Sequence, residues 1–511
     1  MFNKVLSGTL HGVDGRLIVV EADVSEGLPT FNMVGFLASE VREASDRVRT
    51  ALKNSGYQFP PKKVTINLSP ADIRKEGSAF DLPISIALLA AYGFIPEEYV
   101  DNTLFIGELS LNGELKGVRG ILSIVDYARK QGIDKVILPY DNRKEAAIIP
   151  DISVYGAKNL KEVVEHLLGN TCIDEEVHTG LDNVSDDVYD IDFSEVRGQE
   201  SMKRATEIAV AGMHNLLFIG PPGAGKSMIA KRIPTIMPAL TYDESVEITK
   251  IYSAKGMLES ESGLIRNRPF RTPHHSITAQ SLIGGGTVPK PGEISLAHHG
   301  VMFLDEMLEF QKTTLEMLRQ PIEDGKVTIS RMHGSYTFPS DFMLVAAMNP
   351  CPCGYFPDRS RCHCTKPQID RYIRRLSQPM LDRMDMCLQV RRVEYKDLYN
   401  STVSDTSADM KKRIEKAQGL QNARLSKYNV NFNSQIPAGE INELCMLENK
   451  EQKLIKEIFE KHKLTARGIN KILKVSRTIA DLDNSERVCE EHIFEALSYR
   501  MNDFYQGGEG I

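Results

Sequence analysis

Residues 220–227 are Gly220-Pro221-Pro222-Gly223-Ala224-Gly225-Lys226-Ser227, and this octapeptide decides the fold. It fills every fixed position of the phosphate-loop pattern G-x-x-x-x-G-K-[ST]. A strand-like apolar run precedes it (residues 215–219) and a helix-like run follows it (residues 228–232), which is the context that the pattern requires. The sequence therefore predicts a nucleotide phosphate held by backbone N–H groups at a helix N-terminus. In such a site Lys226 reaches the β- and γ-phosphates, and the Ser227 hydroxyl is a ligand of Mg²⁺.

Two further apolar runs end in the polar residues that hydrolysis needs. Residues 300–304 lead into Asp305 and Glu306. At the carboxyl end of a buried strand, Asp305 can hold the Mg²⁺ shell and Glu306 can polarise the attacking water. Residues 342–348 end at Asn349, which can hydrogen-bond the γ-phosphate or orient that water. The pattern thus predicts a nucleotide hydrolase.

Two arginines are candidates for stabilising charge on the transferred phosphoryl group. Arg383 lies in a Leu-Asp-Arg segment just before another apolar run, and such an arginine can be supplied in trans. Arg467 lies in the charged helical region and could reach the same phosphate from a lid. Without a family to guide the assignment, each arginine is explained more simply as a surface charge.

The rest of the chain divides around these motifs. Residues 1–165 alternate strand-like and helical runs, which indicates an α/β or α+β domain. Residues 166–192 form an acidic segment whose simplest interpretation is a solvated linker. Residues 193–395 carry the nucleotide motifs on alternating strands and helices, and residues 396–511 have the pattern of a helical bundle.

Composition and charge exclude few functions. With 41% hydrophobic and 26% charged residues, the 511-residue chain has the composition of a soluble globular protein. Its longest apolar stretch, residues 82–96, is too interrupted to span a bilayer, and the amino terminus has no signal-peptide pattern, so we expect a cytoplasmic location. The net charge is −7, but nine acids fall in residues 173–195, and without them the balance is slightly positive. Global charge therefore neither supports nor excludes nucleic acid.

Four of the eight cysteines lie close together in the chain, at Cys351, Cys353, Cys362 and Cys364. A C-x-C…C-x-C pattern can close a tetrathiolate Zn²⁺ site, although C-x₂-C spacing is commoner. The segment between them is rich in Pro, Gly and Arg, has little core of its own and would gain from a metal. Zinc and free thiols are equally open on this pattern, whereas disulfides are disfavoured in a reducing cytoplasm.

The order of phosphate loop, Asp-Glu strand, Asn strand, Leu-Asp-Arg segment and lid arginine resembles that of the AAA+ ATPases. The likeness extends to residues 271–275 (RTPHH), 284–286 (GGG), 296–300 (LAHHG) and 475–482 (VSRTIADL), which together are similar to the magnesium-chelatase-like ComM/YifB family. The resemblance covers essentially the whole chain. It implies an α/β AAA+ domain with a parallel sheet and a helical lid, and ATP and Mg²⁺ as cofactors.

The same resemblance implies a division of labour between subunits. Acting in cis would be Lys226, Ser227, Asp305, Glu306 and Asn349. Arg383 would act on the ATP of a neighbouring subunit, and Arg467 would be the lid sensor. A finger that acts in trans implies a homo-oligomeric ring, usually a hexamer.

Residues 107–120 (GELSLNGELKGVRG) resemble the Lon-type, S5-like fold. The position of the Lon serine falls on Asp81 and that of the lysine on Leu122, and neither residue can perform that chemistry. Ser78 lies nearby in the sequence, but no lysine stands at the expected position to activate it. The resemblance therefore implies a non-proteolytic α+β domain that binds DNA or supports the ring.

Two segments are candidates for gripping a substrate. Residues 326–338 alternate on both sides of a Gly-containing turn, as in a hairpin, and the resembling AAA+ subgroup projects such a hairpin into its pore. Its tip offers Arg331 and His333, which suit a phosphate backbone. Residues 283–291 form a second, basic loop at the position of the family's other pore insert. Without the family, two surface hairpins with incidental cations would be an equal interpretation.

By this reasoning the chain is predicted to be an ATP-driven hexameric motor on single-stranded or branched DNA. Branch migration in recombination or natural transformation is the expected role. One rival is the motor subunit of a metal chelatase, but these lack a Lon-like amino-terminal domain. Another is a protein-remodelling ATPase, which usually presents an aromatic–hydrophobic pore loop, unlike the Arg331-Met332-His333-Gly334 turn.

Overall fold

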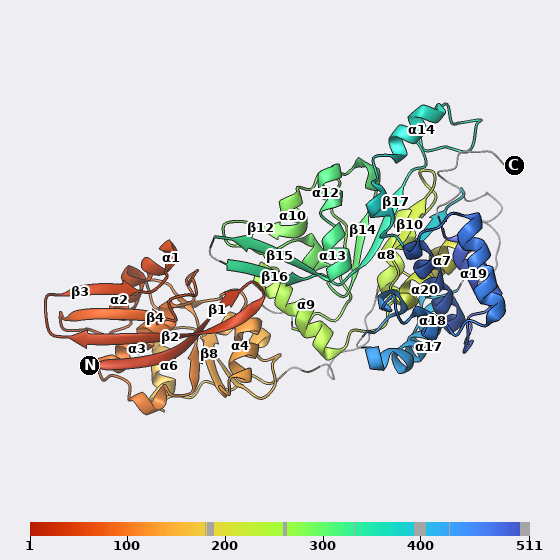
Figure 1. The fold of residues 1–511 in the computed structure, drawn as a ribbon. Coiled ribbons are helices and arrows are strands. Elements are labelled where there is room, and N and C mark those ends of the chain that lie inside the picture. Colours follow the sequence, from red (N-terminus) through yellow and green to blue (C-terminus); the bar gives the residue numbers. More distant parts are fainter. Residues whose placement is uncertain are drawn as a thin grey trace.

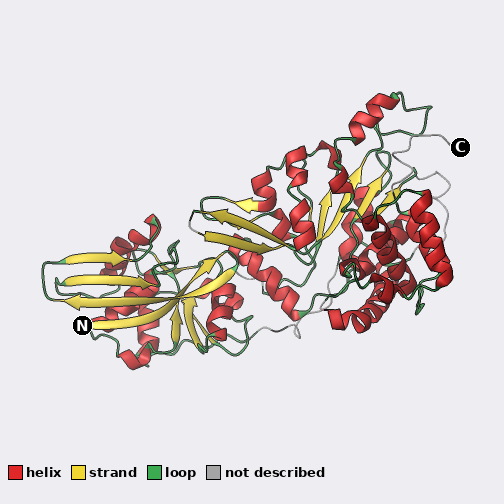
Figure 2. Ribbon diagram, viewed as in Figure 1, coloured by secondary structure: helices red, strands yellow, loops and turns green. Residues whose placement is uncertain are grey.

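The protein forms an elongated particle with its amino-terminal domain at one end (Figure 1). The computed structural model describes residues 1–178, 180, 189–258, 263–332, 334–392, 405–428 and 430–500. Strands lie in the amino-terminal and central regions, whereas the carboxy-terminal region is helical (Figure 2). Within these residues, no helix combines the length and the apolar character needed to cross a membrane.

A seven-stranded mixed sheet, in the order β3-β4-β2-β1-β5-β8-β9, organises the amino-terminal domain. Its strands are β1 (Phe2–His11), β2 (Asp14–Ser25), β3 (Thr30–Val34), β4 (Lys63–Ser69), β5 (Thr103–Phe105), β8 (Lys135–Pro139) and β9 (Ser153–Ala157), and a small ribbon pairs β6 (Glu108–Leu109) with β7 (Leu115–Lys116). The helices are α1 (Ser39–Arg42), α2 (Ala44–Asn54), α3 (Asp81–Ala91), α4 (Ile121–Lys130), α5 (Arg143–Ala146) and α6 (Leu160–Leu167). Every residue of α3 is buried, because this apolar helix packs between the sheet and α2.

The described part of the acidic segment 166–192 is attached to the domains beside it. Ile173 packs on the amino-terminal core, and the Glu176 amide donates to the Val154 carbonyl at 2.9 Å. At the other end, an Asp192 carboxylate oxygen accepts from the Ser407 amide at 3.1 Å. Between these contacts, residues 169–178 are mostly exposed to solvent, and residues 181–188 lie outside the described residues, so the linker stays a prediction.

The central domain has a five-stranded parallel sheet in the order β11-β14-β17-β10-β18. Its strands are β10 (Leu216–Ile219), β11 (Phe270–Arg271), β14 (Val301–Leu304), β17 (Met343–Met348) and β18 (Met386–Gln389). The helices of this domain are α7 (Glu200–Gly212), α8 (Lys226–Ile236), α9 (Tyr242–Lys255), α10 (Ala279–Ile283), α11 (Glu293–Leu296), α12 (Lys312–Glu316), α13 (Arg319–Asp324), α14 (Lys366–Ile373) and α15 (Gln378–Leu381). Strands β10, β14 and β17 are buried throughout, because a parallel sheet is covered on both faces.

Two antiparallel hairpins extend from the central domain. They pair β12 (Gly284–Gly285) with β13 (Lys290–Pro291), and β15 (Lys326–Arg331) with β16 (Gly334–Pro339). The second hairpin reaches the turn between β1 and β2 (Figure 1), where the His11 and Tyr336 rings stack with centroids 4.6 Å apart. Val13 of that turn is buried in the core of the central domain. The amino-terminal domain is thus joined to the hairpin by side-chain packing.

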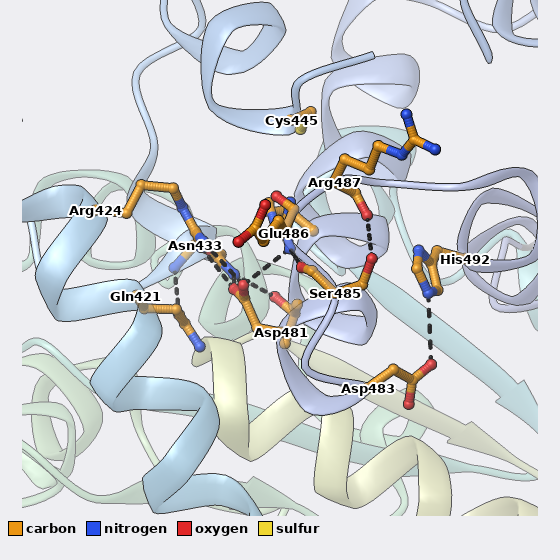
Figure 3. Close-up of polar contacts among 12 residues, drawn as sticks. Gln421, Arg424, Asn433, Cys445, Asp481, Asp483, Ser485, Glu486, Arg487 and His492 are labelled. Carbon is orange, nitrogen blue, oxygen red and sulfur yellow. Dashed lines mark hydrogen bonds and ion pairs between the residues drawn. The ribbon is translucent and has the colours of Figure 1, made fainter. Parts of the chain in front are cut away.

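The carboxy-terminal helices pack against α7 and α8 and share their hydrophobic core. They are α17 (Ser407–Leu425), α18 (Ile441–Cys445), α19 (Asn449–Lys461), α20 (Ala466–Leu482) and α21 (Glu490–Ser498). A buried network of polar side chains ties them together (Figure 3). Asp481 on α20 accepts from Arg424 at 2.6 and 2.9 Å and from Asn433 at 2.8 Å. The fully buried Arg477 completes the network with a 3.1 Å ion pair to Asp481.

Candidate nucleotide site

The phosphate loop connects the carboxyl end of β10 to α8, as its sequence predicts. Gly223 and Gly225 have φ angles of +76° and +86°, and a Cβ atom built on either would meet no atom within 4 Å. The loop therefore leaves open space at both glycines, as a backbone that wraps a phosphate requires.

The magnesium ligands predicted from the sequence lie together at the same edge of the sheet. The Ser227 hydroxyl donates to an Asp305 carboxylate oxygen at 2.6 Å. Asp305 follows β14, and Asn349 follows β17, which lies between β14 and β10 in the sheet. A hydroxyl and a carboxylate at this separation are oxygen ligands of the kind that Mg²⁺ prefers, so these residues fit MgATP.

Lys226 lies over the loop that it terminates. Its ammonium group donates to the Gly220 and Pro221 carbonyl oxygens at 2.5 and 3.0 Å and to the Asn349 side-chain oxygen at 3.4 Å. Burial lowers the pKa of Lys226, and the charge of Asp305 opposes that shift. The amine is thus held between the loop and Asn349, where a β- or γ-phosphate would lie.

Glu306 adopts a backbone conformation that is unusual for a residue with a side chain. Its φ of +49° is in the left-handed region, which costs of the order of 1 kcal/mol and occurs often at active sites. Its carboxylate is 59% exposed and lies 4.0 Å from the His275 ring nitrogen. His275 belongs to the RTPHH motif, which the sequence marked without a role. The structure places that motif beside the carboxylate predicted to activate water.

The two arginines lie together, but away from the phosphate loop of their own chain. Arg383 and Arg467 line one cavity of about 760 Å³. Its walls include Asn215, Phe342 and Asp385, which directly precede β10, β17 and β18. The cavity is therefore at the amino edge of the sheet, whereas the phosphate loop is at the carboxyl edge. Since a four-residue strand such as β10 spans about 13 Å, neither arginine approaches its own Lys226.

Arg383 is held in a fixed position in this cavity. Its guanidinium donates to the Pro379 carbonyl at 2.7 Å and to the Arg319 carbonyl at 3.0 Å, and it pairs with Glu323 at 2.7 Å. Lys471 and Lys474 line the same cavity, together with five acids: Glu323, Asp324, Asp341, Asp382 and Asp385. Lys471 pairs with Asp385 at 2.8 Å, so two of the four cations already have acid partners within the cavity.

The two segments predicted to grip a substrate contact one another. The Arg331 side chain donates to the Gly286 carbonyl at 3.4 Å, which joins the β15–β16 hairpin to the β12–β13 hairpin. Met332 at the tip of the first hairpin is 93% exposed. His333, the other cation predicted at this tip, lies outside the described residues.

The LAHHG motif forms a cluster that sequence reasoning did not foresee. Glu247 accepts from the Nε2 atoms of His298 and His299 at 3.1 and 2.9 Å, and these two hydrogen bonds hold its pKa well below the usual range. The Asp341 amide donates to Nδ1 of His298 at 3.1 Å, so Nε2 of that ring carries its proton. Because a metal would need the lone pair on that nitrogen, the cluster fits a structural bridge between α9 and β17 better than a metal site.

The amino-terminal domain offers no Ser–Lys pair at the position expected from Lon. Asp81 is buried and accepts from Arg47 at 2.9 and 3.0 Å, and burial raises its pKa while Arg47 opposes the shift. Ser78 donates to the Glu108 carboxylate. Lys75 is fully buried, with its amine on the Pro70 carbonyl. Arg47 and Glu108, and not a lysine, are thus the partners of Asp81 and Ser78.

Comparisons with known proteins match three families along the chain. They are magnesium chelatase, subunit ChlI, over residues 192–398; subunit ChlI of Mg-chelatase over residues 20–142; and magnesium chelatase, subunit ChlI C-terminal, over residues 404–500. Lon protease 2 of Bacillus subtilis is 28% identical over 174 residues, 30% of this chain and 31% of that protein. The prediction of a mixed α/β protein with a parallel-sheet AAA+ domain, a helical carboxy-terminal region and a Lon-like amino-terminal region is confirmed.

Two relatives are similar over nearly their whole length. Competence protein ComM of Haemophilus influenzae is 39% identical over 505 residues, 97% of this chain and 97% of its own. Protein YifB of Escherichia coli is 43% identical over 493 residues, 96% of each chain. The phosphate loop, the acid pair and these full-length similarities lead to one conclusion: the chain belongs to the magnesium-chelatase-like ComM/YifB family of AAA+ ATPases.

Proposed function

We propose that this chain is the subunit of an ATP-hydrolysing ring, a homo-hexamer, that moves along single-stranded or branched DNA and promotes branch migration. The observation that carries the proposal is the separation of the two halves of the catalytic site. Lys226 and Asp305 lie at one edge of the central sheet, and Arg383 and Arg467 line a cavity at the other. A complete site then needs the carboxyl edge of one subunit to face the amino edge of the next.

Each residue of the proposed site has a distinct task. ATP with Mg²⁺, the cofactors that the family implies, supplies the phosphoryl group and neutralises part of its charge. Lys226 binds the phosphates, Ser227 and Asp305 hold the metal, and Asn349 orients the water. Glu306 accepts the proton of that water as it attacks. Arg383 of the adjoining subunit stabilises the charge that develops, and Arg467 assists it.

The DNA part of the proposal rests on the hairpins and on the similarity to competence protein ComM. Arg331 and Lys290 lie on two hairpins that touch at Gly286, and both cations suit a phosphate backbone. A cytoplasmic location, where DNA and ATP are both present, is part of the proposal. So is a Zn²⁺ ion on the four clustered cysteines.

Purified protein tests the proposal directly. The rate of ATP hydrolysis should rise when single-stranded DNA or a four-way junction is added. The junction should be separated into its duplex products by branch migration only when ATP is present. Lys226→Ala serves as the inactive control. A rate of ATP hydrolysis that DNA does not change, together with the absence of salt-dependent DNA binding, would contradict the proposal. That result would favour a metal-chelatase motor or a protein-remodelling ATPase.

A further inference from the structure

Four cysteine sulfur atoms converge beside the nucleotide site. The Sγ atoms of Cys351, Cys353, Cys362 and Cys364 all lie within 4.8 Å of one another. Cys351 Sγ is 3.4 Å from Cys353 Sγ and 3.7 Å from Cys362 Sγ. Zn–S bonds of about 2.3 Å in a tetrahedron place sulfur atoms about 3.8 Å apart, which is close to the separations of these two pairs. A disulfide needs a separation of about 2.05 Å and does not fit.

The surroundings of the four sulfur atoms also suit a metal site. Cys351 and Cys362 are 0% and 3% exposed and form an inner pair rooted in the core, while Cys353 and Cys364 lie nearer the surface. The Phe356 amide donates to Cys351 Sγ at 3.4 Å, and N–H groups on a sulfur are the outer contacts that orient metal-binding thiolates. Residues 351–364, all of them described, form no helix or strand, so turn hydrogen bonds, such as that from the Cys362 amide to the Asp358 carbonyl at 2.8 Å, act with the four sulfurs in holding this loop.

This cysteine loop (residues 351–364) packs on the phosphate loop. It begins two residues after Asn349, whose side chain accepts from Lys226. Gly354, at a φ of +84°, lies so close to Pro222 that a Cβ built on it would be 2.7 Å from Pro222 Cδ and 3.8 Å from Asn349 Cγ. The cysteine loop is therefore a wall of the proposed ATP site, and its shape bears directly on where Pro222 and Asn349 lie.

We propose that these four cysteines bind one Zn²⁺ ion, and that the ion positions Pro222 and Asn349 by fixing the cysteine loop against them. The four thiolates supply the complete tetrahedral set, so the site is closed and structural, with no position left for a reacting water. Only the positioning half of this inference rests on the proposed ATPase function. The metal half stands on the sulfur geometry alone.

Metal analysis of the full-length protein tests the first half. One zinc per chain is expected, and Cys351→Ser with Cys362→Ser should lose it, whereas Cys445→Ser, a buried cysteine elsewhere, should keep it. Should the double variant not fold, a mercurial added to the wild type should release one zinc per chain to a chromogenic chelator. Lys226→Ala should retain its zinc, so failure of the ATPase proposal leaves this result readable. Wild type without zinc, or a double variant that keeps it, would overturn the metal site.

Gly354→Ala tests the second half with all four ligands intact. The added methyl must displace Pro222, so zinc content should be unchanged while DNA-independent kcat falls by about 100-fold, as a displacement of about 1 Å can cause. Gly169→Ala is the matched control, because its φ of +73° gives the same backbone strain with no atom within 4 Å of the new Cβ. An unchanged kcat in Gly354→Ala, or an equal loss in Gly169→Ala, would overturn the positioning role.

Discussion

The two edges of the central sheet differ in almost every chemical respect. The carboxyl edge carries a glycine cradle, a hydroxyl, two acids and an amide, and it is arranged to hold a phosphate with its metal. The amino edge carries Arg383, Arg467, Lys471 and Lys474 around a cavity that also holds five acids, and Arg383 and Lys471 each have an acid partner there. In the proposed ring, the cations of the amino edge of one chain act on the phosphates bound at the carboxyl edge of the next. The comparison teaches why the proposal needs two chains: the arginines and the phosphate loop of one chain lie at different edges of its sheet.

Subunit mixing is the strongest way to break this comparison. Arg383→Ala should lower kcat about 1,000-fold while ATP still binds, since the guanidinium acts only on the developing charge. Lys226→Ala should be equally inactive, because it removes the amine that binds the ATP phosphates. Mixed in equal amounts, the two variants should regain hydrolysis, because about a quarter of the interfaces in a random ring combine the intact edges. No recovery on mixing would contradict action in trans, and Arg487→Ala, an exposed arginine paired with Glu448, is the neutral control.

Glu306→Gln, a change at the carboxyl edge, should slow hydrolysis without weakening the binding of ATP. Glu306→Gln keeps the shape of the side chain but cannot accept a proton, so kcat should fall by about 100-fold or more with ATP affinity unchanged. Mixing it with Arg383→Ala should restore activity at the interfaces that combine wild-type Glu306 with wild-type Arg383. Single-turnover hydrolysis alongside a fluorescent nucleotide titration measures both quantities. Loss of ATP binding in Glu306→Gln would show that Glu306 contributes to binding ATP and not only to activating water.

The β15–β16 hairpin belongs to neither edge, and a change there should separate DNA binding from hydrolysis. Arg331→Ala should weaken DNA affinity several-fold and reduce the slope of log affinity against log salt by about 1, because one phosphate contact is lost. Hydrolysis without DNA should not change. Fluorescence anisotropy at several salt concentrations gives the slope, and Lys326→Ala at the base of the same hairpin is a control. An unaltered slope would remove Arg331 from the DNA surface.

The smallest expected effect concerns pH at the amino edge. His214 is buried, 2.8 Å from the Thr478 hydroxyl on α20, and faces Asp385, Lys471 and Lys474. Burial lowers its pKa from 6.5 to about 4, despite the opposing charge of Asp385. Because the folded pKa is below the unfolded value, the stabilisation is present above pH 6.5 and is lost as pH falls towards 4.

This loss should amount to about 1.4 kcal/mol of unfolding free energy per pH unit within that window. Denaturant unfolding at several pH values measures it. His214→Gln should flatten the dependence, whereas His462→Gln in another part of the carboxy-terminal region should leave it unchanged. A dependence that survives in His214→Gln would assign the effect to another group.

The sequence predicted the carboxyl edge well and the amino edge poorly. Lys226, Asp305 and Asn349 are each the first polar residue after a buried strand, so a local pattern places them at one edge once the strands are parallel. The position of Arg467 depends on how α20, distant in sequence, packs beside the residues that precede β18, and nothing local to Arg467 encodes that. The Glu247 cluster escaped prediction for the same reason. In the cysteine loop, spacing suggested the residues, but only folding could show that the sulfurs converge.

The stack of His11 on Tyr336 attaches the β15–β16 hairpin of the central domain to the amino-terminal domain as well. Such aromatic contacts contribute about 1 kcal/mol, close to twice the thermal energy at room temperature. In the proposed motor, a hairpin that shifts along DNA must therefore either carry the amino-terminal domain with it or break this contact at each step. The strength of this contact therefore determines how closely movement of the hairpin is coupled to movement of the amino-terminal domain.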